Sequence, residues 1–234
     1  MATLGGTTGT YAFQPTGGQL ILYAFGRCGI RATALSSEHM RDAAICANLI
    51  QADWATDQPN LWTVGLTSVS LVAGQAAYSI PSNVMLILDA YLEVNPGTSS
   101  AIDTYMYPIS RTEYASLPNK EAEGIPSVYW FDRLLAPTVT LYQTPISSAY
   151  TFNYYYVRQI QDFALANGSQ PEMPIPFLKA FADKLSAELA VMYAPERAKD
   201  LMMAAEMSYK RAKDLNSERT PIYFAPGLNG YYRS

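Results

Sequence analysis

Apolar residues recur at helical spacing near both ends of this chain. A stripe at alternating steps of three and four residues predicts one amphipathic helix from about Ser37 to Thr56. A shorter helix is predicted in "GQLILYAFGRCGI", and it should end at Gly29 because glycine readily takes the conformation that closes a helix. The positions of the longer stripe are Met40, Ala43, Ala47, Ile50 and Trp54.

The helical spacing returns after the turn-prone stretch "LANGSQPEMPIP". It predicts one helix up to Ala194 and a second that starts at Pro195 and runs to about Asn216, because proline is tolerated at the first position of a helix. The two stripes are Leu178, Phe181, Leu185, Leu189 and Met192, then Ala198, Leu201, Ala205, Ala212 and Leu215.

Between the helical regions, from Leu61 to about Phe163, the pattern becomes typical of strands separated by Gly, Pro, Asn and Ser. Gly74 can supply a positive φ, so a hairpin is expected there, and "ISRTEYASLP" should add one helical turn. The predicted strands lie in "NLWTVGLTSVSL", "AAYSI", "VMLILDAYLEV", "SVYWFDR", "TVTLYQT" and "YTFNYYYVRQ".

This order of elements predicts an α+β chain. Helices from both chain ends should form a helical bundle, and an antiparallel β-sandwich or barrel-like domain should be inserted into it. The expected divisions are a flexible N-terminal arm (1–18), a helical bundle (19–58 and 174–218), an inserted β-domain (59–165) and a C-terminal docking tail (219–234).

Composition points to contacts with other proteins. Hydrophobic residues make up 49% of the chain and charged residues only 15%, which leaves less charged surface than a typical monomer has. The net charge of −4 disfavours general binding to nucleic acid or acidic membranes. The N-terminus shows no signal-peptide pattern, so synthesis and assembly in the cytoplasm are expected. Cys28 and Cys46 are expected to be reduced and packed.

Little in the sequence indicates catalysis. His39 is the single histidine, and the cysteines lack zinc-site spacing, so neither a metal site nor a cofactor is expected. "GGTTGT" lacks the Lys-Ser/Thr ending of a phosphate loop, and "NGS" at Asn167 is interpreted as a turn. Glu113, Glu121 and Glu123 could support acid/base hydrolysis of a cell wall, but a solvated surface role explains them more simply.

Tyrosines raise an alternative function. Nine of the eighteen tyrosines lie between Tyr105 and Tyr156, so the strands could form a carbohydrate-binding tail or adhesin module. Alternation along a strand places Tyr154 and Tyr156 on one face and Tyr155 on the other. Packing in the core or at an interface is the stronger interpretation. The tail "TPIYFAPGLNGYYRS" is expected either to fold back on the β-domain or, in preference, to dock onto a neighbour.

Two segments together resemble a known family. The alanine-rich helix ending at Trp54, followed by "NLWTVGLTSVSLVAGQAAYSIP" and an apolar strand, is similar to the N-terminal half of head-to-tail adaptor (connector) proteins of short-tailed phages. These are the packaged-DNA-stabilising, or tail-tubular-A-like, connectors. "PIPFLKAFADKLSAELAVMYAPERAKDLMMAAEMSYKRAKDLNSE" resembles their closing helix pair, and the two segments cover most of residues 37 to 218.

The resemblance implies a virion protein and no enzyme. It implies a ring of about twelve copies beneath the portal protein, extending the DNA channel to the tail nozzle or tail tube protein. Packaged DNA would pass without sequence-specific binding, and no membrane would be involved. The residues that the resemblance assigns to portal binding are Tyr209, Lys210, Arg211 and Lys213 on the last helix, with Tyr223, Phe224, Tyr231 and Tyr232 in the tail.

Overall fold

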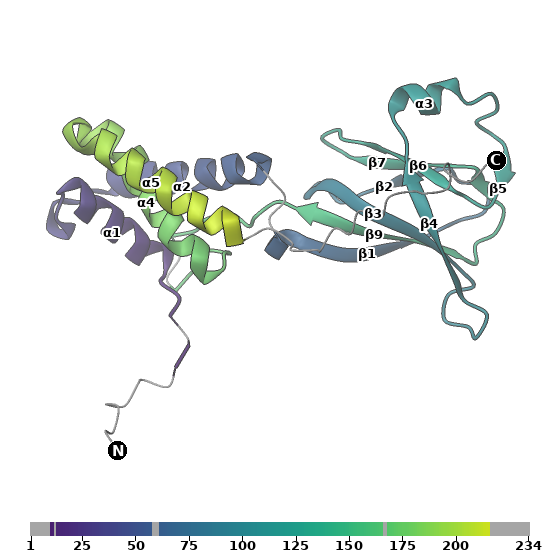
Figure 1. Ribbon diagram of the computed structural model, residues 1–234, viewed down its shortest axis with the longest axis horizontal. Coiled ribbons are helices and arrows are strands. Elements are labelled where there is room, and N and C mark those ends of the chain that lie inside the picture. The colour runs from purple at the N-terminus through teal and green to yellow at the C-terminus, as the bar shows by residue number, and fades with distance from the viewer. Residues whose placement is uncertain (1–9, 12, 58–60, 166–167, 216–234) are drawn as a thin grey trace, which may run out of the picture.

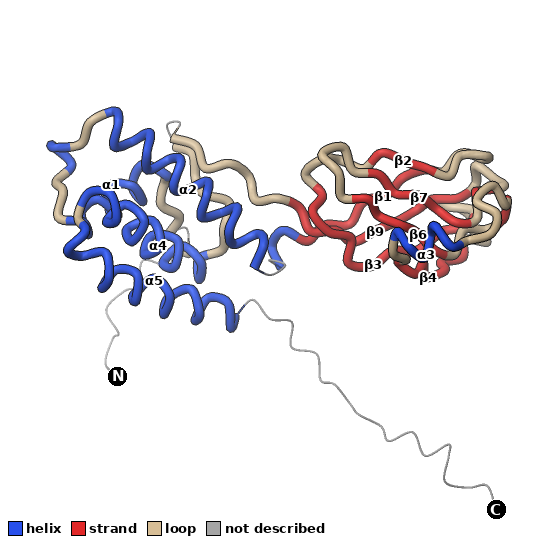
Figure 2. Tube along the Cα trace, turned by 90° about the horizontal axis from the view of Figure 1, so that it is seen from above, coloured by secondary structure: helices blue, strands red, loops and turns tan. Residues whose placement is uncertain are grey.

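The computed structural model describes residues 10–11, 13–57, 61–165 and 168–215. Figure 1 shows the long helices gathered at one end of the molecule and the strands at the other. Figure 2 shows the same separation from above. The protein is therefore α+β, as the sequence pattern predicts. No helix in the described ranges is long and apolar enough to cross a lipid bilayer.

The first helix, α1 (Gly17–Cys28), is closed at both ends by local signals. At its start, the Thr16 and Gln19 side chains each accept a hydrogen bond from the other residue's backbone, which makes a capping box. At its end, Gly29 takes a φ of 87°. The predicted stop at Gly29 is confirmed, and the helix starts two residues before residue 19, where the helical bundle was expected to begin.

The second long helix, α2 (Ser37–Asp57), follows a short 3-10 turn, η1 (Ala32–Ala34). Its predicted extent is confirmed to within one residue. The predicted stripe is also confirmed, since four of its five members are buried and Met40 packs against them while partly exposed. The four buried members are Ala43, Ala47, Ile50 and Trp54.

Two helices complete the described C-terminal part, α4 (Ile175–Tyr193) and α5 (Pro195–Leu215). The break at Ala194 and the restart at Pro195 are as predicted. Met192 and Leu215 were expected on the buried stripes, and that expectation is wrong: both are exposed. Each lies in the last turn of its helix, where no neighbouring element covers it.

Side chains from α1, α2, α4 and α5 share one apolar cluster. Helix α4 lies at its centre, because residues around most of its circumference are buried, including Phe181, Leu185 and Leu189. Alanines face this helix from α2 and α5, among them Ala47 and Ala205, and small side chains allow helices to approach closely. Cys28 lies in the cluster and Cys46 at its border, and both are free thiols, as expected.

The strands form a seven-stranded sheet in the order β1-β9-β3-β4-β6-β7-β2 and a separate two-stranded ribbon of β5 and β8. A short 3-10 turn, η2 (Leu61–Thr63), leads into the sheet, and the predicted helical turn is α3 (Arg111–Ser116). The strands are β1 (Val64–Ser70), β2 (Ala77–Ser79), β3 (Val84–Val94), β4 (Ile102–Pro108), β5 (Glu123–Gly124), β6 (Val128–Asp132), β7 (Thr138–Tyr142), β8 (Thr144–Pro145) and β9 (Tyr150–Arg158).

The sheet curls around a single core, so the barrel-like expectation fits better than the sandwich. Tyr78 of edge strand β2 shares an apolar cluster with Leu92 of β3 and Phe152 of β9, which are central strands. The expectation of purely antiparallel pairing is wrong at β4 and β6, which run parallel. Parallel strands need a crossover of about a dozen residues or more, and the connection through α3 provides it.

The hairpin expected at Gly74 is also wrong. The chain does turn there, with a φ of 78° at Gly74, and the Tyr78 hydroxyl donates to the Gln75 carbonyl at 2.8 Å. However, β1 pairs with β9 and β2 pairs with β7, at opposite edges of the sheet. Every residue of β1 pairs with a residue of β9, whereas β2 is only three residues long. The longer antiparallel ladder therefore determines the pairing.

Candidate interaction site

Helix α5 exposes two methionines to solvent, away from its own buried residues. Leu201, Ala205 and Ala212 face the core, whereas Met203 and Met207 are both more than half exposed. A spacing of four residues places these two side chains on one face of the helix, one turn apart. Methionine is flexible and polarizable, and it is common on adaptable binding surfaces. The outer face of α5 therefore has the character of a protein contact surface.

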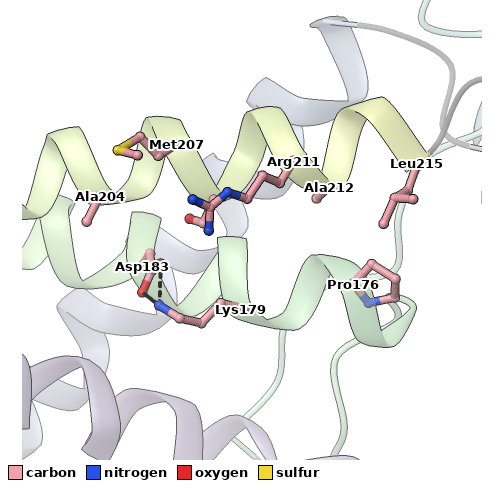
Figure 3. Close-up of a pocket in the computed structure, with 9 residues that line it drawn as sticks. Pro176, Lys179, Asp183, Ala204, Met207, Arg211, Ala212 and Leu215 are labelled. Atoms are coloured by element: carbon pink, nitrogen blue, oxygen red, sulfur yellow. Dashed lines mark hydrogen bonds and ion pairs between the residues drawn. The ribbon is translucent and has the colours of Figure 1, made fainter.

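Cations follow the methionines along α5. Lys210 and Arg211 are both exposed. Figure 3 shows Arg211 reaching from α5 over a groove between α5 and α4. The groove has a volume of about 400 Å³, and Met207 and Leu215 contribute apolar surface to its wall. A cation beside apolar side chains suits a partner that brings an apolar side chain together with a carboxylate.

The carboxylate of Asp183 lies at the floor of this groove, and its side chain is 2% exposed. It accepts hydrogen bonds from the guanidinium of Arg27 on α1 and from the ammonium of Lys179 one turn earlier on α4. A buried charge requires such compensation. The Arg27–Asp183–Lys179 cluster therefore ties α1 to α4, and the charge of Asp183 is already satisfied within the chain.

Tyr209 and Lys213 point toward α2 instead of toward solvent. The Tyr209 ring stacks on Trp54 with 4.8 Å between ring centroids, and its hydroxyl donates to Asp57 Oδ2 at 2.9 Å. Lys213 Nζ donates to the same oxygen at 2.6 Å. The hydrogen bond from Lys213, followed by the one from Tyr209, lowers the pKa of Asp57. Burial, followed by the bond to Asp57, raises the pKa of Tyr209. These contacts fasten α5 to the end of α2.

Only part of the predicted portal-binding set can be placed. Of its members on α5, Lys210 and Arg211 lie together and exposed, while Tyr209 and Lys213 are engaged with α2. The sequence reasoning did not single out Met203 and Met207, although their spacing of four residues on a charged helix was visible. The tail residues Tyr223, Phe224, Tyr231 and Tyr232 lie outside the described residues, as does Asn167.

Two of the side chains considered for catalysis, His39 and Glu113, make local hydrogen bonds at helix starts. His39 Nδ1 shares a 2.6 Å hydrogen bond with the Ser36 hydroxyl just before α2. Glu113 accepts from the Ser110 backbone N–H at 2.6 Å in the capping box of α3, and this bond lowers its pKa. A general acid needs a raised pKa, so the environment of Glu113 opposes the hydrolase hypothesis. No group of three or more His, Cys, Asp or Glu residues suited to a metal ion occurs in the described ranges.

The tyrosines considered for sugar binding at positions 154 to 156 lie on strand β9. Tyr154 is 1% exposed and stacks on Phe152 with 5.3 Å between ring centroids, and Tyr156 packs against the same apolar cluster. Tyr155 points outward and is exposed, so the predicted alternation is confirmed. Tyr154 cannot stack on a sugar from inside the core, so the interpretation as core packing is correct for Tyr154 and Tyr156.

Comparison with known proteins agrees with the resemblance found in the sequence. A search of curated proteins gives no significant match. The model of the SU10 adaptor protein family matches residues 29–226, a span that includes all the described long helices except α1, together with the whole sheet. Because this match covers well over half of the chain, the protein belongs to the SU10 adaptor protein family and is a structural protein of the phage head-to-tail adaptor type.

Proposed function

We propose that about twelve copies of this chain form a ring on the phage portal, extend the DNA channel, retain packaged DNA and provide the surface to which the tail nozzle or tail tube attaches. The ring assembles in the host cytoplasm and remains in the virion neck. Family membership supports this role. The observation that carries the portal contact is the exposed methionine and cation face of α5, in an adaptor that must bind another protein.

The helical bundle and the β-domain have different roles in this proposal. Helices from both chain ends (19–58 and 174–218) form the bundle that meets the portal, and the inserted β-domain (59–165) faces the next tail component. The arm (1–18) and the tail (219–234) are the remaining parts, and the tail is assigned to docking. The shared cluster of α1, α2, α4 and α5 supports this division, as does the separate cluster inside the sheet.

The portal surface consists of the outer face of α5 and the tail that follows it. Lys210 and Arg211 supply charge, Met203 and Met207 supply apolar area, and Tyr209 and Lys213 hold the helix in place through Asp57. The tail adds four aromatic anchors, a residue type enriched where proteins meet. They are Tyr223, Phe224, Tyr231 and Tyr232. Repetition around a ring strengthens each weak contact, since a held copy favours the next.

Net charge supports the channel role. The chain carries a formal charge of −4, and a ring of such chains repels the phosphates of passing DNA. A strongly basic wall would release counterions and hold the DNA. Packaged DNA is therefore expected to slide through without sequence-specific binding.

Native mass spectrometry of the chain mixed with portal rings from the same phage tests the proposal. The wild type should bind the portal as a multi-copy complex. Lys210→Glu combined with Arg211→Glu should reduce the bound fraction at least tenfold, because both charges change sign on the exposed face. The matched control, Arg31→Glu with Arg111→Glu, reverses two exposed charges on elements other than α5 and should bind like the wild type.

A measurement of thermal unfolding distinguishes a loss of portal binding from a loss of folding. The α5 double variant should keep the wild-type unfolding midpoint, since neither side chain is buried. Absence of any wild-type complex with the portal would refute the proposed function. Equal binding by the α5 variant and the wild type would remove α5 from the contact surface and leave the family role intact.

A further inference from the structure

The turn between β6 and β7 carries an unusual pair of side chains. Residues 133–137 connect the two antiparallel strands, and within them Leu134 is 62% exposed and Leu135 is 101% exposed. Hairpin turns ordinarily carry Gly, Asn, Asp or Ser, because those residues suit the turn geometry and water. Two adjacent leucines at a hairpin tip have no place in the sheet's own core, so they form an apolar knob.

The helical part of the chain carries an apolar groove, which matches the knob in chemistry. A groove of about 490 Å³ runs between α1 and α4 and continues under the residues that precede α1. Its lining is largely apolar, and several of the lining side chains are themselves exposed, so water contacts apolar surface there. The members used in this argument are Phe13, Leu20, Tyr23, Ile175, Leu178 and Lys179.

The knob cannot reach the α1–α4 groove of its own chain. Figure 1 places the β6–β7 hairpin in the strand part of the molecule and α1 and α4 in the helical part. Figure 2 shows the same separation from a perpendicular direction. An apolar patch and a complementary pocket at different places on one chain produce a heterologous contact, in which each copy gives its patch to one neighbour and its pocket to another. A closed ring satisfies both in every copy.

We propose that the apolar knob of Leu134 and Leu135 inserts into the α1–α4 groove of the next copy in the ring. This inference rests on the proposed ring. Charge does not oppose the pairing, since Asp132 and Arg133 at the base of the knob offset each other and Lys179 in the groove lining is paired with Asp183. A portal or tail protein would cover either the knob or the groove, whereas a second copy covers both.

Cross-linking on the assembled ring tests the contact. Leu135→Cys and Tyr23→Cys are combined in a Cys46→Ser background, which leaves only the buried native Cys28. The variant is assembled on portal rings and treated with a short bismaleimide. A ladder of covalent multimers is expected in denaturing gels, and neither single cysteine variant should give one. Wild-type-like rings without a ladder would overturn the inference.

Removal of the knob provides the second test. Leu134→Ser with Leu135→Ser should keep the unfolding midpoint of the wild type, because these side chains are solvent-exposed, and should lose ring assembly on the portal. Ile125→Ser is the matched control, since Ile125 is 52% exposed elsewhere in the strand part, and it should assemble normally. Rings formed by the double variant would overturn the inference and leave the adaptor role standing. Absence of wild-type rings would refute the proposed function, and the inference with it.

Discussion

Replacement of the buried carboxylate in the Arg27–Asp183–Lys179 cluster should test how the helices are held together. Asp183→Asn keeps the shape of the side chain and removes its charge. The amide oxygen can still accept one hydrogen bond, but Arg27 and Lys179 lose their counter-ion. The variant therefore isolates the electrostatic contribution of Asp183 at the contact between α1 and α4.

The expected magnitude follows from how exposed each partner is. Breaking a fully buried ion pair costs about 3–5 kcal/mol. The Lys179 side chain is 63% exposed and regains water, whereas that of Arg27 is only 22% exposed and stays largely desolvated. Because only Arg27 stays poorly hydrated, the loss of folding free energy should lie near the lower limit, at about 3 kcal/mol. This loss corresponds to roughly a hundredfold change in the folding equilibrium.

A second variant makes the prediction sharper. Arg27→Met with Asp183→Leu removes both charges and fills the space with apolar atoms, so it should cost less than Asp183→Asn alone, at about 1 kcal/mol. Urea denaturation followed by far-UV circular dichroism measures both, provided that the slope against urea stays constant. A loss below about 1 kcal/mol for Asp183→Asn, or a larger loss for the double variant, would refute the reasoning.

Three further changes test other contacts. Trp54→Ala should cost about 4 kcal/mol in urea denaturation, because it leaves a cavity among three helices, whereas Tyr209→Phe, which loses one hydrogen bond and keeps the stacked ring, should cost about 1 kcal/mol. The hydrogen bond from Arg158 lowers the pKa of Glu172 below 4.5, so the contribution of this carboxylate to stability is complete above that pH and is lost as the pH falls through the lower folded value. Glu172→Gln should therefore differ most from the wild type at pH 6 and approach it as the pH falls below 4.5, as measured by thermal scans. Burial raises the pKa of Cys28, so alkylation at pH 8, mapped by peptide mass spectrometry, should be slower in the native than in the denatured chain.

The helices could be predicted from the sequence because their signals are local. The stripe of α2, the stop at Gly29 and the restart at Pro195 each depend on residues within a few positions. Strand pairing depends on residues far apart, and the turn at Gly74 joins two strands that pair elsewhere. Strand β4 (Ile102–Pro108) was not predicted, because only Met106 is buried and no apolar alternation marks it.

The same contrast between local and long-range signals applies to the candidate sites. Lys210 and Arg211, which the resemblance assigns to portal binding, are exposed, whereas Tyr209 turns inward onto Trp54, which lies far away in the sequence. Leu134 and Leu135 lie between two predicted strands, and only the observed pairing of β6 with β7 shows that they form the tip of a hairpin. Local patterns therefore identify elements, whereas the surface that an element presents depends on tertiary pairing.

The rigidity of α5 connects this packing to the proposed docking. The helix is fixed along its inner side by the α4 contact and near its end by the bonds of Tyr209 and Lys213 to Asp57. A binding helix that is already ordered loses little conformational entropy on docking, so more of the contact energy appears as affinity. Loss of the Asp57 carboxylate in Asp57→Ala should therefore weaken portal binding without touching the outer face of α5. Lys210 and Arg211 can contact a partner because other side chains hold the helix that carries them.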